Sequence, residues 1–494
     1  MVKAVVGEES QLKLAEDRLS QAAVPSEVGL LIGKLSKNLD RGFVFDLIPT
    51  PQNDASEPAS SVVESVKDDN KKKGTKGKAQ LDSSVLFIDK DWVAEHARQV
   101  SRMLPGGMNV VGVYIWVSES MFKNSTLILC QTVKAVSEAA PVLETDSDER
   151  LLIHISYSPR RWVCRNCSLA SNITTSSLRP CDFKMGKVLT SLQAFRCLYN
   201  FDLRLPICLE KGLRFGKLSD IVRRGLSIHA KMLKGAKGLI SGRLVTEDEQ
   251  SAPDRLHEVE FLLPFLQDKY LEACSEKEVV GLLVFSGSVC SFSYLNPKEP
   301  ISQAFDDIKE DIIMSLQSRL DIMCDEADQE SESIIESDEV ASHHRSSEKH
   351  IPEFDLQLQR KYCSLPFPRR VFAPWLGSTY ICDYIQPSET IEVLKEHCIE
   401  LMSMEAPKDA STILEPEFEN PMLIASITKS FWDIAGRLSV ESNPENSVSK
   451  NKEKARSQGT EQKASCSPDL NVIMAILVLI ISIVLGLALF FFRS

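Results

Sequence analysis

Strand-like and helix-like patterns of apolar residues alternate along the first part of the chain. Residues 9–23 place apolar side chains among charges at the spacing of a short amphipathic helix. Residues 28–35 and 43–49 are short apolar runs that are typical of buried strands. Polar turn residues separate these two runs, so we predict that they form a hairpin.

The pattern continues between residues 84 and 158. A strand is expected from Ser84, and residues 91–104 have the apolar stripe of a helix. Residues 109–118 form a nearly continuous β-branched run, which indicates a central strand. The run 126–136 fits either a strand or a helix, and 151–158 is a further strand. This order of elements predicts a mixed α/β domain.

A second set of patterns indicates another α+β unit. Strands are expected at 256–265 and at 278–296, the latter as a hairpin that turns at Gly287. Residues 301–327 repeat apolar side chains every three or four positions and predict a long amphipathic helix. Residues 365–385 are a strand-forming block. Shorter patterns predict a strand region at 195–208 and helices at 217–236, 388–403 and 421–438.

Three polar stretches are predicted to be disordered, because they lack the apolar residues that a packed core requires: 51–82, 328–350 and 439–469. Lysines of the first stretch can contact acidic lipid headgroups, and the alternative is a solvated loop. The second stretch holds His343, His344 and His350, for which metal binding is the alternative to a solvated loop. The expected organisation is an α/β domain at 1–230, a second α+β domain at 231–438, a flexible linker at 439–469 and a transmembrane helix at 470–492.

The segment Val472–Phe492 contains 21 residues without a charge, and Ser482 is its one weakly polar side chain. As a helix it measures about 31 Å, close to the thickness of a bilayer core. The alternative is a buried core helix. Upstream lie five basic residues, against Arg493 beyond it, which predicts a cytosolic bulk and a lumenal C-terminus. Acidic residues replace the apolar core of a signal peptide at the N-terminus. The sequence therefore predicts a tail-anchored protein.

Composition limits the class of protein further. The 494 residues are 43% hydrophobic and carry a net charge of −12, with 57 basic and 69 acidic residues. No basic domain or zinc-finger array indicates a nucleic-acid partner. The thirteen cysteines of a cytosolic chain are expected to be reduced thiols. The sequons at Asn124, Asn166 and Asn172 are then expected to carry no glycan.

Candidate chemistry is sparse in this sequence. It contains no phosphate-binding loop, no G-x-S-x-G turn and no H-E-x-x-H motif. We interpret His96, His154 and His397 as packed or surface side chains, although a Cys–His dyad stays open as an alternative. A zinc site or a redox-active C-x-x-C is the alternative to unrelated thiols for four cysteines: Cys164, Cys167, Cys181 and Cys197.

The segments VGLLIGKL, FVFDLIPTP and NVVGVYIWVS resemble the core strands of MPN domains, which occur in deubiquitinating metalloproteases and in their inactive partners. Active members carry a glutamate, an H-x-H pair, a serine and an aspartate. On alignment, the histidine positions fall on Ile115 and Val117, the serine on Ser125 and the aspartate on Ile128, while Glu27 is displaced by one residue. The resemblance implies an MPN-like fold without a metal, a cofactor or hydrolase activity.

A longer resemblance covers most of the chain. Residues 29–51, 307–323 and 369–385, together with the final apolar segment, are similar to the odorant-response-abnormal protein four family. Membership implies a non-enzymatic, tail-anchored adaptor of the endoplasmic reticulum that assists the folding and delivery of G-protein-coupled-type receptors. The family is also linked to a cysteine protease that processes a ubiquitin-fold modifier. Family members are implied to anchor this protease at the reticulum through MPN-like domains. A metal-dependent isopeptidase with relocated ligands is the remote alternative.

Overall fold

We describe the chain from a computed structural model, in which every described residue belongs to the compact unit Met1–Leu438. The predicted linker 439–469 and the predicted span Val472–Phe492 lie outside the described residues, so both stay predictions. Of the helices in the described part, none combines the length and apolar character that crossing a bilayer requires. The described residues are 2–36, 39–64, 84–142, 149–169, 177–209, 218–245, 256–264, 278–339, 363–417 and 422–427.

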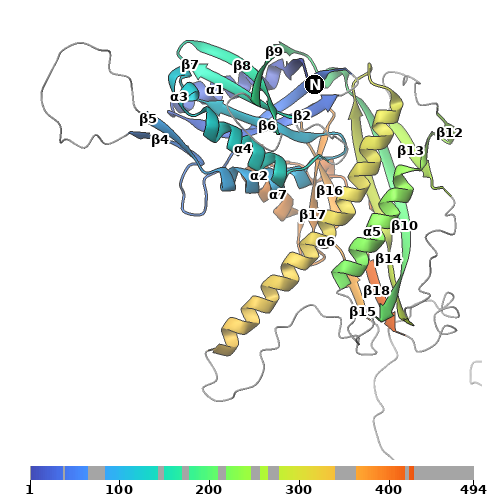
Figure 1. Cartoon of the computed structure of the whole chain (residues 1–494). Coiled ribbons are helices and arrows are strands. Elements are labelled where there is room, and N and C mark those ends of the chain that lie inside the picture. The colour runs from blue at the N-terminus through green and yellow to red at the C-terminus, as the bar shows by residue number, and fades with distance from the viewer. Residues whose placement is uncertain are drawn as a thin grey trace, which may run out of the picture. The chain divides into compact units, whose positions relative to one another are not determined.

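The N-terminal part forms a closed seven-stranded barrel (Figure 1). The predicted hairpin is confirmed, because its two strands pair antiparallel. The run at 109–118 is confirmed as a central strand, which pairs with neighbours on both sides. In barrel order the strands are β1 (Ala4–Glu8), β3 (Arg41–Pro49), β2 (Glu27–Ser36), β6 (Asn109–Trp116), β7 (Glu149–Tyr157), β8 (Arg160–Ser168) and β9 (Leu178–Gly186).

Helices cover the barrel strands and divide their apolar side chains between two cores. Helix α1 (Glu9–Ala22) buries Leu12, Ala15 and Leu19 in one core. The helices α2 (Lys90–Arg102), α3 (Glu119–Asn124) and α4 (Thr126–Ala139) contribute to the other core. The ambiguous run 126–136 is therefore a helix, since its buried side chains recur every three or four residues.

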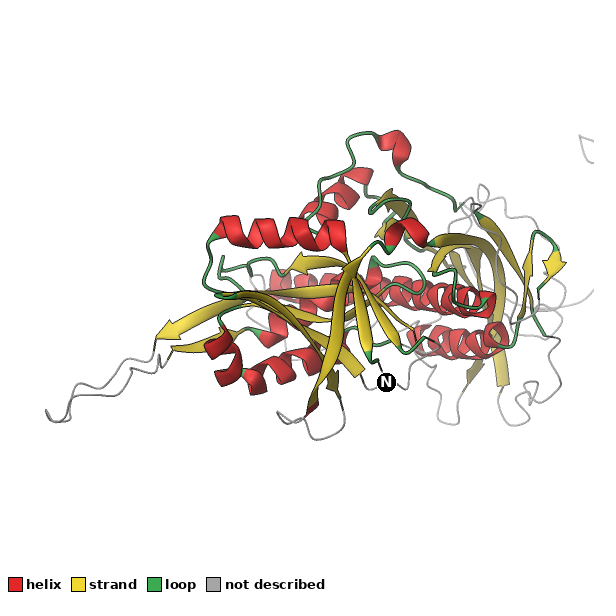
Figure 2. Ribbon diagram, turned by 90° about the horizontal axis from the view of Figure 1, so that it is seen from above, coloured by secondary structure: helices red, strands yellow, loops and turns green. Residues whose placement is uncertain are grey.

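A two-stranded ribbon corrects the prediction for residues 51–82. Strand β4 (Ser60–Glu64) pairs antiparallel with β5 (Ser84–Ile88), and the two form a sheet of their own. Asn53 accepts hydrogen bonds from the backbone nitrogens of Ala55 and Glu57 and so orders the preceding turn. The prediction of disorder is thus wrong for residues 51–64, and 65–82 lie outside the described residues. Figure 2 shows the ribbon projecting beside the helices.

The second sheet has seven strands, and helices α5 (Leu218–Lys234) and α6 (Ile301–Glu339) pack on it (Figure 1). The expected boundary at residue 230 falls within α5, whereas the chain already enters this sheet at Gln193. In spatial order the strands are β12 (Arg243–Leu244), β11 (Lys237–Ile240), β13 (His257–Leu262), β10 (Gln193–Leu209), β14 (Glu278–Leu295), β18 (Met422–Ile427) and β15 (Cys363–Pro366).

Three predictions for this part of the chain are wrong. Residues 278–295 are one long strand rather than a hairpin, because β10 pairs along its whole length and Gly287 lies opposite Phe201. Residues 422–427 are a strand instead of a helix, because they fill the gap between β14 and β15. Helix α6 continues to Glu339, so the predicted loop at 328–350 is helical over its first part. His343, His344 and His350 lie outside the described residues.

The strand block at 365–385 is confirmed, and its buried side chains share a core with barrel residues and with β14 of the second sheet. Strands β16 (Arg369–Pro374) and β17 (Tyr380–Ile385) pair antiparallel. The backbone nitrogen of Cys382 donates to Met103 O beyond α2, over 2.8 Å. Helix α7 (Ile391–Glu400) follows, and short 3-10 helices occupy Leu189–Ser191 and Ala410–Thr412. The described part thus has a mixed α+β fold with seven α-helices, while the MPN-like assignment stays a prediction.

Candidate functional site

The residues at the predicted MPN metal positions are packed in an apolar core. Ile115 and Val117 are fully buried at the end of β6, and Ile128 of α4 packs against the same core. Ser125 is buried between α3 and α4. Isoleucine and valine side chains offer no donor atom to a metal ion. Three of the aligned positions are therefore brought together, but as packing residues.

Glu27 belongs to the opposite face of the barrel wall. It forms an ion pair with Arg18 of α1 at 2.8 Å and accepts a hydrogen bond from Tyr114 Oη over 2.7 Å. Side chains of successive strand residues point to opposite faces, so Tyr114 and Ile115 face different cores. The glutamate is thus separated from the aligned metal positions by the sheet itself.

His154 and His96 are packed side chains that bind backbone carbonyls. Nε2 of His154 lies 3.0 Å from Val117 O, and its ring stacks on Phe122 with centroids 4.2 Å apart. Nε2 of His96 lies 2.8 Å from Leu401 O. Burial lowers the pKa of both histidines, which favours the neutral imidazole. Both side chains therefore stabilise packing between elements.

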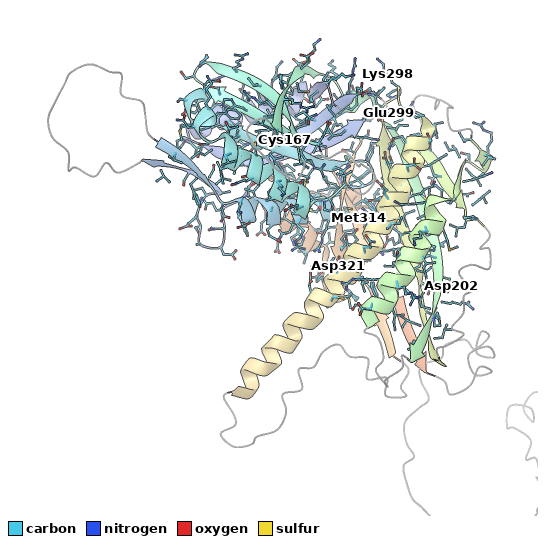
Figure 3. All side chains as sticks on the ribbon, in the orientation of Figure 1. Cys167, Asp202, Lys298, Glu299, Met314 and Asp321 are labelled. Atoms are coloured by element: carbon cyan, nitrogen blue, oxygen red, sulfur yellow. The ribbon has the colours of Figure 1, made fainter. Side chains whose placement is uncertain are left out.

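The four cysteines of the alternative zinc site are not brought together. Cys164 and Cys167 lie three residues apart on β8, so their side chains enter different cores. Cys164 lies opposite Cys181 in the register of β8 and β9, whereas Cys167, labelled in Figure 3, contacts Cys130 of α4. Cys197 lies in the second sheet. Within the described residues, no group of three or more potential ligands could hold a metal ion.

A polar cleft of about 130 Å³ lies where the barrel meets α6. Lys34 of β2 lines it and is buried, with Nζ 2.6 Å from Asp307 and 3.8 Å from Glu299. Burial by itself would lower the pKa of Lys34, but the two carboxylates more than offset this and raise it. Lys34 therefore links the barrel to helix α6 through a buried ion pair.

The loop Pro105–Gly107 also approaches α6 closely, at Asp307. Gly107 has a φ of 79°, and a Cβ atom there would collide with the carboxylate of Asp307. Gly106 forms an isolated bridge with Ser293 of β14. Ser293 and Gln303 also donate hydrogen bonds to Asp307. Asp307 is thus held by groups from the barrel, the second sheet and α6.

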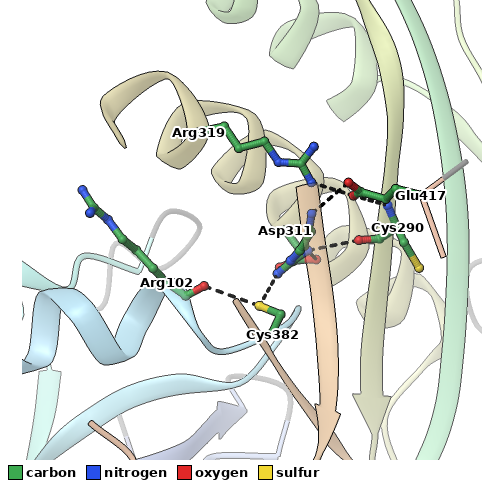
Figure 4. A network of polar contacts seen from close by, with 7 residues as sticks. Arg102, Cys290, Asp311, Arg319, Cys382 and Glu417 are labelled. Atoms are coloured by element: carbon green, nitrogen blue, oxygen red, sulfur yellow. Dashed lines mark hydrogen bonds and ion pairs between the residues drawn. The ribbon is translucent and has the colours of Figure 1, made fainter. Parts of the chain in front are cut away.

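A second buried ion network borders the cleft (Figure 4). Arg370 of β16 donates to both carboxylate oxygens of Asp311, at 2.7 and 2.9 Å, and to Cys290 O at 3.1 Å. Burial alone would lower the pKa of Arg370, but Asp311 raises it well above its usual range. Arg370 also lies 3.0 Å from Cys382 Sγ, and that thiol donates to Arg102 O at the end of α2.

Glu417 extends this network toward the middle of α6. It pairs with Arg319 at 2.6 Å and accepts hydrogen bonds from the backbone nitrogens of Cys290 and Arg370. Two residues after Arg319 on the same helix, the side chain of Asp321 (labelled in Figure 3) is exposed to solvent. Arg319 and Glu417 are each at most 1% exposed at the side chain.

The two ion networks link the barrel to the second sheet. We call them together the joint, which consists of Lys34, Asp307, Asp311, Arg319, Arg370 and Glu417. Asp307, Asp311 and Glu417 each have a cationic partner, so these carboxylates are committed to structure. Burying an ion pair of this kind costs desolvation energy. Removing one partner costs more, because the other charge is then buried without a counter-charge. We therefore interpret the charged residues around the cleft as groups that fix the barrel against the second sheet, and not as groups that transfer protons.

Comparison with known proteins identifies the family. The family model named ODR4-like, "Odorant response abnormal 4-like", matches residues 29–413. The chain belongs to the ODR4-like family. The matched region includes the barrel from β2 onward, the second sheet through β15, and the strand pair β16–β17.

Curated relatives agree with this assignment. The Xenopus laevis "Protein odr-4 homolog" is 25% identical over 454 residues, covering 87% of this ODR4-like chain and 88% of its own. The Homo sapiens homologue is 25% identical and covers 76% and 77%, respectively. The Dictyostelium discoideum homologue is 24% identical over 405 residues. These relatives are named as odr-4 homologues, and the names state no catalytic activity.

One solved structure, UfSP from C. elegans, matches with a TM-score of 0.33 and 7% identity. The match covers 82% of the ODR4-like chain and spans 57% of that structure's chain. A score this low carries no argument about fold or function.

Sequence reasoning missed the charged residues of the joint. The signal was a charge within an apolar pattern: Lys34 interrupts the run at 28–35, and Arg370 opens the apolar part of the block at 365–385. Asp311 lies between the apolar positions of α6. Charged side chains in such places are seldom fully buried unless paired. The partner of each could not be read from the sequence.

One pH dependence arises at the edge of the joint. His397 of α7 and Asp383 of β17 form an ion pair, with Nδ1 and Oδ2 2.8 Å apart. The hydrogen bond from Asp383 raises the pKa of His397 above its ordinary value of 6.5. Such a group stabilises the fold fully below pH 6.5 and loses this contribution as the pH rises through its folded-state pKa.

We therefore expect His397→Gln to destabilise the ODR4-like chain at low pH only. The side chain is 38% exposed, so the expected loss is modest, about 0.5 kcal/mol. Urea unfolding of both proteins at about pH 5.5 and about pH 9 measures it. A difference between the proteins that is equal at the two pH values contradicts the assignment.

Proposed function

We propose that this chain is a non-enzymatic adaptor tethered to the endoplasmic-reticulum membrane, which assists the folding and delivery of membrane receptors of the G-protein-coupled type. Membership of the ODR4-like family over residues 29–413 is the observation that carries the proposal. The apolar segment Val472–Phe492 supports the tether, because its length matches a bilayer core. The apolar side chains of Ile115, Val117 and Ile128 support a role in binding rather than metal-dependent hydrolysis.

Deletion of residues 471–494 tests the tether. We expect the shortened chain to leave the membrane fraction and to lose its effect on receptor delivery, because the adaptor no longer meets its clients at the bilayer. Surface biotinylation of a receptor client in knockout cells measures delivery. The matched control replaces 472–492 with an unrelated apolar segment of equal length, which should restore delivery. Full rescue by the deleted chain would refute tethering as the mechanism.

The family resemblance also implies a second role, the anchoring of a protease that processes a ubiquitin-fold modifier. Three kinds of knockout cell separate the roles: cells without the chain, cells with the deleted chain and cells with the replaced segment. If the protease leaves the membrane fraction in knockout cells while receptor delivery is unchanged, protease anchoring replaces receptor delivery as the function. If both change and both return with the replaced segment, the two roles coexist on one tether.

A further inference from the structure

The β4–β5 ribbon presents an apolar face to solvent. Val63 is 51% exposed, Val85 56% and Phe87 54%. The strand register places Val63 opposite Val85 and Ser61 opposite Phe87, so the three apolar side chains share one face. Exposed apolar groups that cluster in this way mark an interaction site more often than isolated ones do.

The other face of the ribbon is fixed to the protein. Leu86 and Ile88 are 3% exposed and belong to the core that α2 and α4 complete, and Val62 packs against it. Strand β5 contacts α3 and α4. The ribbon is therefore held on one side, and its exposed face is left without a covering element from the described part of the chain. Figure 1 shows the ribbon extending outward from the helices.

The chain between the two strands supplies a charge argument for the partner. Residues 65–83 contain six lysines and three aspartates, so this connection has a net positive charge. Their placement lies outside the described residues, and the charge follows from the sequence alone. Apolar side chains next to a basic segment match the two attractions that a bilayer with acidic headgroups offers. A strand-adding protein would instead pair with the ribbon's edges and leave this face unused.

We propose that the face formed by Val63, Val85 and Phe87 docks on an anionic lipid bilayer. The face then places the barrel against the membrane surface and limits the orientations that a C-terminal tether alone would allow. The inference rests on the proposed membrane tether, because the tether is what brings the ribbon close to a bilayer. Lipid contact by the ribbon is a separate claim and has a separate readout.

The test uses the full chain with Phe87→Trp, mixed with vesicles of phosphatidylcholine alone or with added phosphatidylserine. Part of the lipid carries brominated acyl chains, which quench tryptophan on contact. Relative to the parent chain, we expect a blue-shifted, quenched component with phosphatidylserine and its loss at high salt. The matched control is Leu198→Trp, an exposed apolar position on β10 of the second sheet, which should stay unquenched. Adding Val63→Ser and Val85→Ser should weaken the quenching at position 87.

Flotation of the same vesicles reports the tether independently. Flotation with both lipids and quenching only with phosphatidylserine supports both proposals. Flotation with both lipids and no quenching overturns the ribbon proposal and leaves the tether standing. Flotation only with phosphatidylserine, with quenching, supports the ribbon and overturns the tether. Equal quenching with either lipid overturns the anionic preference. A fluorescence change that needs added cytosol and no vesicles assigns the face to a protein partner and also overturns the proposal.

Discussion

Asp311→Ala is expected to lower the free energy of unfolding by about 3–5 kcal/mol, because it leaves the guanidinium of Arg370 buried without its counter-charge. Both side chains are at most 4% exposed, and the pair is bidentate. Arg370 keeps its bonds to Cys290 O and Cys382 Sγ, but neither partner carries a full negative charge. Urea unfolding, followed by tryptophan fluorescence, measures the loss.

Two controls separate the buried charge from a loss of any ion pair. Asp202→Ala removes the partner of Arg204, a pair at 2.9 Å whose side chains are about half exposed, and should cost under about 1 kcal/mol. The double variant Asp311→Leu with Arg370→Met replaces the buried pair by apolar groups and should recover much of the loss. Equal losses from Asp311→Ala and Asp202→Ala would show that the joint tolerates an unpaired charge.

The elements that could be predicted from the sequence are those whose pattern is local. Strands β2, β3, β6 and β7 each show an apolar run, and the amphipathic stripe of α6 is unbroken over many turns. The failures depend on partners distant in sequence. Gly287 indicates a turn locally, yet β10 pairs with the strand on both sides of it without interruption. Likewise, β18 is a strand because two separate strands lie beside it.

The candidate site divides in the same way. The residue types at Ile115, Val117 and Ile128 could be read from an alignment, and the burial of Ile115 and Val117 follows from the apolar run around them. That Glu27 faces the other core could not, because it depends on the register between β2 and β6. The joint depends on contacts over longer separations still, such as Lys34 with Asp307 and Arg319 with Glu417. Sequence spacing contains no information on such pairs.

Gly112→Ala is expected to destabilise the barrel by about 3 kcal/mol or more, because the added methyl group would overlap the backbone of the neighbouring strand β7. Gly112 lies in the middle of β6, between Leu31 of β2 and Leu151 of β7. A Cβ atom there would collide with the backbone carbonyl of Leu151, and backbone cannot rotate away as a side chain can.

The matched control for this variant is Gly186→Ala at the end of β9. A Cβ atom at Gly186 meets only the Cγ1 atom of Val6 at 3.3 Å, so a small side-chain shift accommodates it and the loss should stay under about 1 kcal/mol. Thermal unfolding of the two variants and the parent protein compares them directly. If both glycines cost the same, the close approach of β6 and β7 is not what requires Gly112. A selective loss would show that the glycine within the run VVGVY sets the strand spacing, and with it the position of the buried residues on either face.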